Sequence, residues 1–190
     1  MKLIFATHNP NKVKEIQNLL PNHIQLLSLN DLEYTKEIVE YGKTIEENAK
    51  IKTATISELF DMPCFADDTG LEVEALNGQP GVKSARYAGE AKSDDANKKK
   101  LLKNLEGQTN RTARFKTVIS YKNGIEDKEF IGICEGDITQ TPNGKGGFGY
   151  DPIFKPKGFS ETFAEMSAAQ KNQISHRSLA FKQLIEYLKG

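Results

Sequence analysis

Residues 3–20, LIFATHNPNKVKEIQNLL, contain the pattern from which the expected class of fold follows. The first four of these residues are continuously apolar, which is typical of a strand covered on both faces. Between Asn11 and Leu20 apolar residues recur at helical spacing, and Pro21 is expected to stop the helix. Because a strand that passes through a loop into a helix is the building unit of α/β proteins, this stretch predicts an α/β class.

The rest of the chain continues to interleave strand-like and helical patterns. Thr44 and Glu47 have capping-box spacing, which predicts a helix to about Phe60. Asn123-Gly124 lies between two apolar runs and predicts a long hairpin, which can extend the sheet into a second lobe. The other expected elements are strands at 24–29, 63–66 and 71–73, a helix at 93–105 capped by Ser93, hairpin strands at 115–121 and 130–138, a glycine-rich loop at 142–151 and a helix at 175–189.

Length and composition limit the possible partners. A chain of 190 residues suits one domain, residues 1–190, that folds without a structural metal or disulfide. With 26 basic and 26 acidic residues, no global field attracts nucleic acid or a membrane surface, so a phosphate ligand must be held locally. The lysine run at 98–100 has no interleaved aromatic residues and indicates a solvated face.

The two cysteines and the N-terminus indicate the compartment. Cys64 and Cys134 are too few for a disulfide scaffold and are expected to be buried free thiols. The first apolar run is far shorter than a signal-peptide core or a membrane span. We therefore expect a soluble cytoplasmic protein.

THNPNK, residues 7–12, lies where the first strand meets a helix N-terminus. The free backbone N–H groups and the positive dipole end of a helix suit a phosphate group. Thr7 and Asn9 can donate further hydrogen bonds, and Lys12 adds a positive charge. Since the glycines of a Walker A or GxGxxG loop are missing, an ordinary capped helix start is the alternative.

FADDTGLEV, residues 65–73, places Asp67 beside Asp68 between two apolar runs. Adjacent carboxylates repel each other unless water, a cation or donor groups offset their charge. In a loop the two can converge on one point, whereas in a regular strand they would face opposite ways. We expect a loop at this position and not a regular strand. In such a loop a carboxylate can bind Mg²⁺ beside phosphate oxygens and take a proton from water. A plain surface turn without this chemistry is the alternative.

GKGGFGYDP, residues 144–152, is richer in glycine than a linker needs. Glycine permits close backbone approach to a ligand. Phe148 and Tyr150 offer faces for a base to stack on, and Asp151 can accept hydrogen bonds from a base edge. A flexible hairpin tip is the alternative.

KNQISHRS, residues 171–178, places three basic side chains around the start of the last helix. Arg177 suits planar hydrogen bonding to phosphate or to a base carbonyl. His176 has no His or Cys partner at metal-ligand spacing, so a zinc site is not expected. Lys171 supplies the third positive charge.

Five blocks, THNPNK, EENAKIK, FADDTGLEVEALNGQPGVKSARYAG, GGFGYDPIF and KNQISHR, together resemble the inosine triphosphate pyrophosphatase family, also called Ham1-like proteins or XTP/dITP diphosphatases. The resemblance covers nearly the whole chain. It implies an elongated α/β fold with a central mixed sheet, flanking helices and an active-site cleft between two lobes, usually as a homodimer. It also implies Mg²⁺-dependent cleavage of inosine, deoxyinosine and xanthosine triphosphates to the monophosphate and pyrophosphate, with no nucleic-acid or membrane partner.

The resemblance also assigns roles to residues. It implies that Glu40 and Asp68 bind the metal and that Asp68 accepts a proton. Thr69 stands where many members have Ser, and Tyr41 follows Glu40 where Thr is common. The implied substrate-binding residues are Thr7, His8, Asn9, Pro10, Asn11, Lys12, Lys52, Thr69, Phe148, Gly149, Tyr150, Asp151, Lys171, His176 and Arg177.

A Maf-like enzyme and a nucleotide-sensing module are the two alternative functions. A Maf-like nucleotide pyrophosphatase would prefer pyrimidines, and the SHR and FGYD blocks argue against it. A nucleotide-sensing module would bind without turnover, and the presence of Asp68 and Lys12 argues against that.

Overall fold

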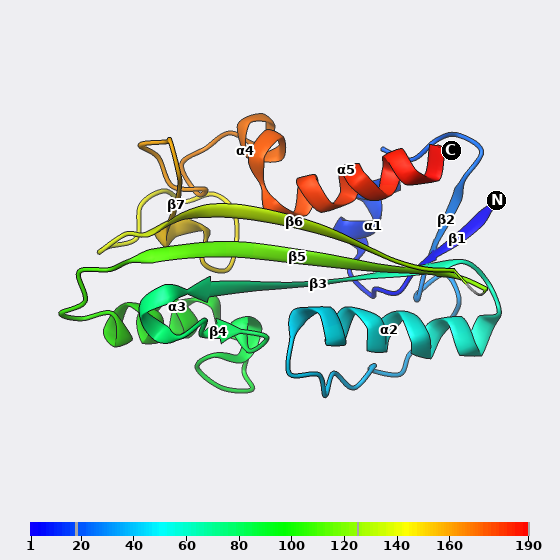
Figure 1. Cartoon of the computed structure of the whole chain (residues 1–190), viewed down its shortest axis with the longest axis horizontal. Coiled ribbons are helices and arrows are strands. Elements are labelled where there is room, and N and C mark those ends of the chain that lie inside the picture. The colour runs from blue at the N-terminus through cyan, green and yellow to red at the C-terminus, as the bar shows by residue number, and fades with distance from the viewer. Residues whose placement is uncertain (18, 125, 190) are drawn as a thin grey trace. The chain divides into compact units, whose positions relative to one another are not determined.

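The computed structural model describes residues 1–17, 19–124 and 126–189 and has an α/β architecture (Figure 1). The strands are β1 (Lys2–Phe5), β2 (Gln25–Ser28), β3 (Cys64–Val73), β4 (Pro80–Gly81), β5 (Thr112–Asn123), β6 (Glu126–Ile138) and β7 (Phe154–Pro156). The helices are α1 (Pro10–Gln17), α2 (Ile45–Phe60), α3 (Asp94–Asn104), α4 (Ala168–Ile174) and α5 (His176–Lys189). Short 3-10 turns cover Glu74–Leu76, Ser84–Arg86 and Asp151–Ile153.

The described strands form one seven-stranded sheet in the order β2-β1-β3-β5-β6-β7, and β4 pairs with β3 outside this path. β1 runs parallel to β2 and β3, whereas β4 is antiparallel to β3 and β7 is antiparallel to β6. The sheet is therefore mixed, as the resemblance implied. No helix in the described part of the chain is long and apolar enough to cross a membrane.

The chain divides into two compact units. Unit 1 comprises Met1–Asp68, Val118–Ile131 and Ala180–Gly190, and unit 2 comprises Thr69–Thr117 and Gly132–Leu179. Each unit has a hydrophobic core of its own. The single-domain assignment and the cleft between two lobes stay predictions.

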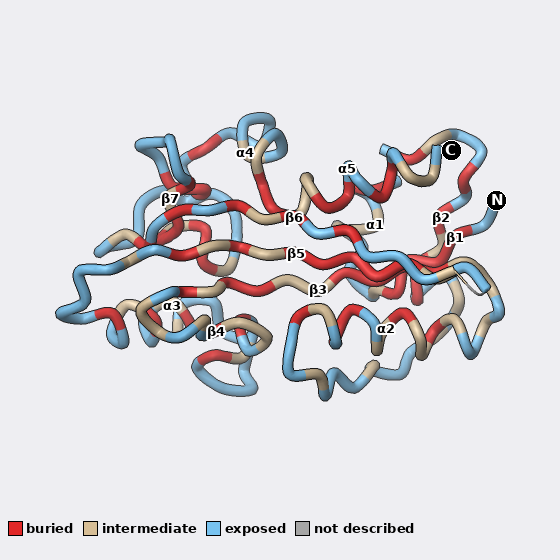
Figure 2. Tube along the Cα trace, in the orientation of Figure 1, coloured by how far each residue is buried: buried red, intermediate tan, exposed pale blue. Residues whose placement is uncertain are grey.

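In unit 1 the first strand is buried on both faces, as its continuous apolar run predicted. On one face the Phe5 ring stacks on Phe65 with centroids 4.4 Å apart, and the Phe181 ring of α5 packs edge-on against both. On the other face Ile4 packs with Ile56 of α2. Lys2 at the start of β1 is exposed, whereas the rest of β1 and the start of β3 are buried and appear red in Figure 2.

Most local signals were confirmed. The α2 capping box forms, with Thr44 Oγ1 accepting from the Glu47 N–H at 3.1 Å. β1, β2, α3 with its Ser93 cap, the β5–β6 ribbon and α5 lie where they were expected. The two cysteines are buried free thiols, also as expected.

Two helix predictions were incomplete. The first helix was expected to reach Leu20 but ends at Gln17. Leu20 instead lies in a turn held to the Ile16 carbonyl, where it is buried in the unit 1 core. The short helix α4 was not predicted, although Ser167 caps it by accepting from the Gln170 N–H at 3.2 Å.

The prediction of two short strands flanking a loop at Asp67 and Asp68 was wrong. Residues Cys64–Val73 form one continuous strand, β3. In the sheet β3 lies between β1 and β5. β1 pairs with Cys64 and Phe65 before the Asp-Asp-Thr-Gly run, and β4 pairs with Leu71 and Glu72 after it. Pairing at both ends of the run, with β5 as the other neighbour, holds it extended and overrides the turn preference of these residue types.

Candidate active site

The extended backbone of β3 sends the two adjacent carboxylates to opposite faces of the sheet, where each meets its own lysine. Lys12, on α1, donates to both carboxylate oxygens of Asp67 at 2.8 and 2.7 Å. Lys52, on α2, donates to Asp68 Oδ1 at 3.1 Å. The repulsion between the two aspartates is thus offset by a separate cation on each face.

Lys52 also joins Asp68 to the loop that precedes α2. Its Nζ lies 3.0 Å from Glu40 Oε1 and 3.1 Å from Asp68 Oδ1. Burial opposes the charged form of Lys52, but the carboxylates of Asp68, Asp67 and Glu40 together hold its pKa above the ordinary value. Lys52 therefore stays protonated while it bridges two acidic side chains.

Burial raises the pKa of Asp68 above the ordinary carboxyl value. The nearby carboxylates of Glu40 and Asp67 raise the pKa further, and only Lys52 opposes the shift. A carboxylate with a raised pKa is a stronger base than an ordinary one. Asp68 is thus the carboxylate of this cluster suited to accept a proton.

The residues predicted to bind the metal fit a magnesium ion. Glu40 and Asp68 direct hard carboxylate oxygens at a single cation, the Lys52 ammonium group. Mg²⁺ commonly takes one or two protein carboxylates and fills its other positions with water and substrate phosphate oxygens. The described residues hold no group of three or more His, Cys, Asp or Glu arranged as a metal cage, so phosphate and water would have to complete the coordination.

In the Thr7–Lys12 loop, the side chains that were expected to donate hydrogen bonds accept them instead. Thr7 Oγ1 accepts from the Asn9 N–H at 3.2 Å, and Asn9 Oδ1 accepts from the Lys12 N–H at 3.4 Å. These bonds organise the start of α1, as the capped-helix alternative proposed. Such a cap and a phosphate site can coexist, because hydroxyl and amide groups can also donate.

The other residues of this loop have different surroundings. His8 Nδ1 lies 3.1 Å from Asn30 Oδ1, and His8 Nε2 lies 3.3 Å from the Lys36 carbonyl. Pro10 is the first residue of α1, where a missing N–H costs no helical bond. The side chain of Asn11 lies outside the described part of the structure.

In unit 2 the glycine-rich loop is held by buried polar groups. Asp151 Oδ2 accepts from the Phe148 N–H at 2.9 Å and from Lys171 Nζ at 2.5 Å. Asp151 is only 3% exposed. Its carboxylate therefore anchors the loop, a role the sequence did not indicate.

Of the two aromatic rings expected to meet a base, the structure exposes one. Tyr150 is 5% exposed, and its hydroxyl donates to the Ser84 carbonyl at 2.8 Å. Phe148 is 61% exposed. The stacking prediction was therefore wrong for Tyr150, whose ring belongs to the core, and stays a prediction for Phe148.

Two cations flank the exposed ring. Lys171 Nζ lies 5.2 Å from the centre of the Phe148 ring, and the Arg177 guanidinium carbon lies 5.4 Å from it. The buried Arg177 Nε has no hydrogen-bond partner among the described residues. Arg177 therefore retains a donor for a ligand acceptor.

The remaining predicted residues have structural contacts. The His176 ring stacks on Phe115 with ring centres 4.5 Å apart and is 6% exposed, and its predicted contact with substrate stays a prediction. Thr69 Oγ1 lies 2.8 Å from Thr117 Oγ1. Unit 1 thus gathers Lys12, Glu40, Lys52, Asp67 and Asp68, and unit 2 gathers the group around Phe148.

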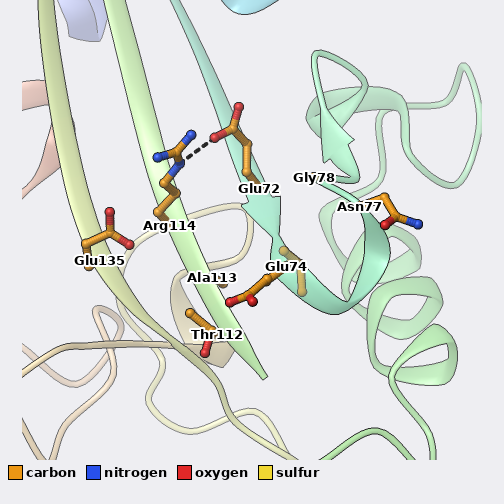
Figure 3. A pocket seen from close by; sticks show the side chains of 9 residues that line it. Glu72, Glu74, Asn77, Gly78, Thr112, Ala113, Arg114 and Glu135 are labelled. Atoms are coloured by element: carbon orange, nitrogen blue, oxygen red, sulfur yellow. Dashed lines mark hydrogen bonds and ion pairs between the residues drawn. The ribbon is translucent and has the colours of Figure 1, made fainter. Parts of the chain in front are cut away.

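A separate hollow of about 400 Å³ in unit 2 contains none of the predicted residues. It is lined by the ends of β3 and β5, with Glu135 of β6 at one side (Figure 3). Arg114 Nε donates to Glu72 Oε2 at 2.6 Å across it. Because this arginine is already paired with a carboxylate, the hollow presents a mainly acidic surface that is unsuited to a triphosphate.

A mixed-sheet α/β fold with lysine–carboxylate clusters at a helix start and on the adjoining strand defines a protein suited to phosphate ligands. The chain belongs to the Ham1 family, whose model matches residues 3–187. This membership confirms the resemblance and argues against the Maf-like alternative.

Relatives and solved structures agree with this membership. Proteins named dITP/XTP pyrophosphatase from Christiangramia forsetii and Flavobacterium johnsoniae are 55% and 53% identical, and each comparison covers at least 98% of both chains. The chain is similar to the Staphylococcus aureus Ham1 protein, with a TM-score of 0.96, 41% identity and coverage of 100% of this chain and 99% of that one. A nucleoside-triphosphatase / dITP/XTP pyrophosphatase from Mycobacterium abscessus gives a TM-score of 0.86 at 38% identity, with 97% and 99% coverage.

Proposed function

We propose that the protein hydrolyses inosine, deoxyinosine and xanthosine triphosphates to the nucleoside monophosphate and pyrophosphate. The observation that carries the proposal is the unit 1 cluster, in which Lys52 joins Glu40 to the high-pKa carboxylate of Asp68. The names of relatives that match over nearly their full length, dITP/XTP pyrophosphatase, support the substrate class. Removal of such nucleotides would cleanse the nucleotide pool.

In the proposed reaction a water molecule attacks the α-phosphorus. Asp68 takes a proton from this water, a new P–O bond forms, and the bond from the α-phosphorus to the bridging oxygen breaks. Pyrophosphate leaves with the bonding electrons. Lys12 and Lys52 stabilise the negative charge that develops on the leaving group, because preformed positive groups bind a transition state without reorganisation.

Mg²⁺ is the proposed cofactor, and Glu40 and Asp68 would hold it. When bound, it would neutralise phosphate charge and polarise the phosphoryl oxygens. Lys12 and Lys52 then have phosphate oxygens as alternative partners to the carboxylates they contact in this structure.

In unit 2, Phe148 and Arg177 are the proposed contacts for the base. An exposed ring provides a stacking face, and a buried guanidinium donor suits the six-position oxygen of hypoxanthine or xanthine. Adenine presents a donor at that position and would leave the arginine unpaired. We infer a preference for inosine over adenosine triphosphate of on the order of 10² in kcat/KM.

The proposal is tested with a panel of inosine, xanthosine, adenosine, guanosine, uridine and cytidine triphosphates, with pyrophosphate detected as product. Inosine and xanthosine triphosphates are expected to be the best substrates. A preference for pyrimidines would support the Maf-like function instead. Tight binding without pyrophosphate release would support the sensing module.

We also propose that the protein acts in the cytoplasm as a homodimer, with no nucleic-acid or membrane partner. The balanced charge supports the absence of an electrostatic pull toward polyanions. Light scattering coupled to size-exclusion chromatography tests the dimer, and a monomeric mass at micromolar concentration would contradict it.

A further inference from the structure

The start of α3 contacts the glycine-rich loop from a distant part of the chain. Asp94, the first residue of α3, accepts a hydrogen bond at its Oδ2 from the Gly149 N–H at 2.7 Å, although the two residues are 55 positions apart. Gly149 has a φ of +59°, in the left-handed region that favours glycine. A carboxylate acceptor makes this bond stronger than one between neutral groups.

Asp94 supplies the exposed anchor of a loop whose other anchors are buried. The Asp151 carboxylate holds the Phe148 N–H, and the Tyr150 hydroxyl holds the Ser84 carbonyl. The side chains of Asp151 and Tyr150 are both buried. With all anchors in place, the ring of Phe148 is the large apolar group that the loop presents.

The helix that carries Asp94 is itself firmly attached. Asn97 is 2% exposed, and its side chain accepts from the Ala88 N–H at 2.6 Å and donates to the Ala85 carbonyl at 3.0 Å. Lys100 Nζ donates to the Tyr87 carbonyl at 2.6 Å. Lys100 is exposed, as the predicted solvated lysine face requires, and its bond to Tyr87 helps to make α3 a fixed support for the loop.

A hollow of about 610 Å³ lies where α3 meets the loop, bordered by Asp94, Lys98, Gly147 and Phe148. This volume lies within the range of about 300 to 1,000 Å³ typical of small-molecule sites. Phe148 forms part of its wall. The position of this ring therefore affects the shape of a hollow large enough for a ligand.

We propose that Asp94 is a positioning residue for purine recognition. By holding the Gly149 N–H, it keeps the glycine-rich loop in the conformation that presents the Phe148 ring to the base. Asp94 acts through the loop and takes no proton in the reaction. The inference rests on the proposed function, because it assigns a base-binding role to Phe148.

Three variants test it by steady-state kinetics with inosine triphosphate. Asp94→Ala removes the acceptor and is expected to raise KM about tenfold while kcat changes less than threefold, since one charge-assisted hydrogen bond is lost. Asp94→Asn retains an acceptor oxygen and should recover most of the lost affinity. Asp95→Ala is the matched control, because Asp95 follows Asp94 on the same helix turn but pairs with Lys98 at 2.9 Å.

Amide hydrogen exchange at Gly149 gives a second readout that needs no substrate. Asp94→Ala should speed this exchange at least fivefold, and Asp95→Ala should leave it unchanged. If Asp94→Ala matched Asp95→Ala in either KM or Gly149 exchange, the proposal would be overturned. If the wild-type protein hydrolysed no purine triphosphate, the proposed function would be wrong, whereas Gly149 exchange would still show whether Asp94 holds the loop.

Discussion

At the scale of single residues, Asp68 combines the features expected of a base. It is a half-buried carboxylate whose pKa is raised by burial and by Glu40, and Lys52 holds it in place. Asp67, its neighbour in sequence, instead forms a tight pair with Lys12 on the other face. Two identical adjacent side chains thus have different chemistry because the strand separates their surroundings.

Asp68→Asn should nearly abolish hydrolysis of inosine triphosphate while the protein stays folded. Loss of a general base typically costs about 10² to 10⁴ in rate, and the amide cannot take the proton. The measurement is kcat by pyrophosphate release, with circular dichroism as the folding control. Turnover within threefold of wild type in a folded variant would contradict the role.

The raised pKa of Asp68 also predicts how stability depends on pH. Ionised Asp68 is less favourable in the folded than in the unfolded chain, so it lowers stability above its folded pKa and has no effect below the ordinary carboxyl value of 3.8. Asp68→Asn should therefore be at least as stable as wild type at pH 7, with an advantage that shrinks as the pH falls. Urea unfolding at pH 5, 6 and 7 measures the free energy of unfolding of both proteins. If Asp68→Asn were less stable than wild type by an amount that grows with pH, the prediction would be refuted.

At the scale of elements, the glycine-rich loop contains a position that only glycine can occupy. Gly147 has a φ of +70°, and a side-chain carbon there would collide with the Asp151 carboxylate. Gly158 also has a positive φ, +86°, but a side-chain carbon there meets no atom within 4 Å. Comparing alanine substitutions at the two positions therefore separates the cost of backbone strain from the effect of displacing the Asp151 carboxylate.

Gly147→Ala should destabilise the protein and raise KM for inosine triphosphate, because the methyl group displaces Asp151. Gly158→Ala should lose only the backbone component, about 1 kcal/mol, with KM unchanged. Thermal unfolding and steady-state kinetics on both variants provide the comparison. Equal KM values for the two variants would show that the Asp151 anchor does not affect the substrate.

At the scale of the whole molecule, neutral charge means that local groups must bind a triphosphate. Among the described residues, the carboxylates of Glu40 and Asp68 both contact Lys52, but no group of three or more possible metal ligands is present. Magnesium affinity should therefore be weak without nucleotide and stronger with it, because phosphate oxygens supply ligands that the chain lacks.

Removal of divalent metal should stop turnover without unfolding the protein. Excess chelator is expected to reduce hydrolysis of inosine triphosphate at least a hundredfold, since the metal offsets phosphate charge. Added Mg²⁺ should restore the rate, while the unfolding temperature in the absence of nucleotide stays the same. Full activity in chelator would rule out the metal-dependent mechanism.

The class of fold, most element positions and the family were predictable from the sequence alone. These features depend on short-range patterns, such as the apolar run of β1, the Thr44–Glu47 box and the Asn123-Gly124 turn, whose physics acts over a few residues. The motif blocks likewise indicated Lys12, Lys52 and Asp68, because their residue types suit phosphate and metal chemistry.

Which side chains contact one another depended on how the chain packs in three dimensions. Pairing with β1 at its start, with β4 at its end and with β5 made residues Cys64–Val73 one strand, which sent Asp67 and Asp68 to different lysines. Core packing buried the Tyr150 ring, and folding brought Asp94 to Gly149 across 55 residues. Local propensity carries no information about partners that far away, because such contacts form only when the sheet and its helices pack together.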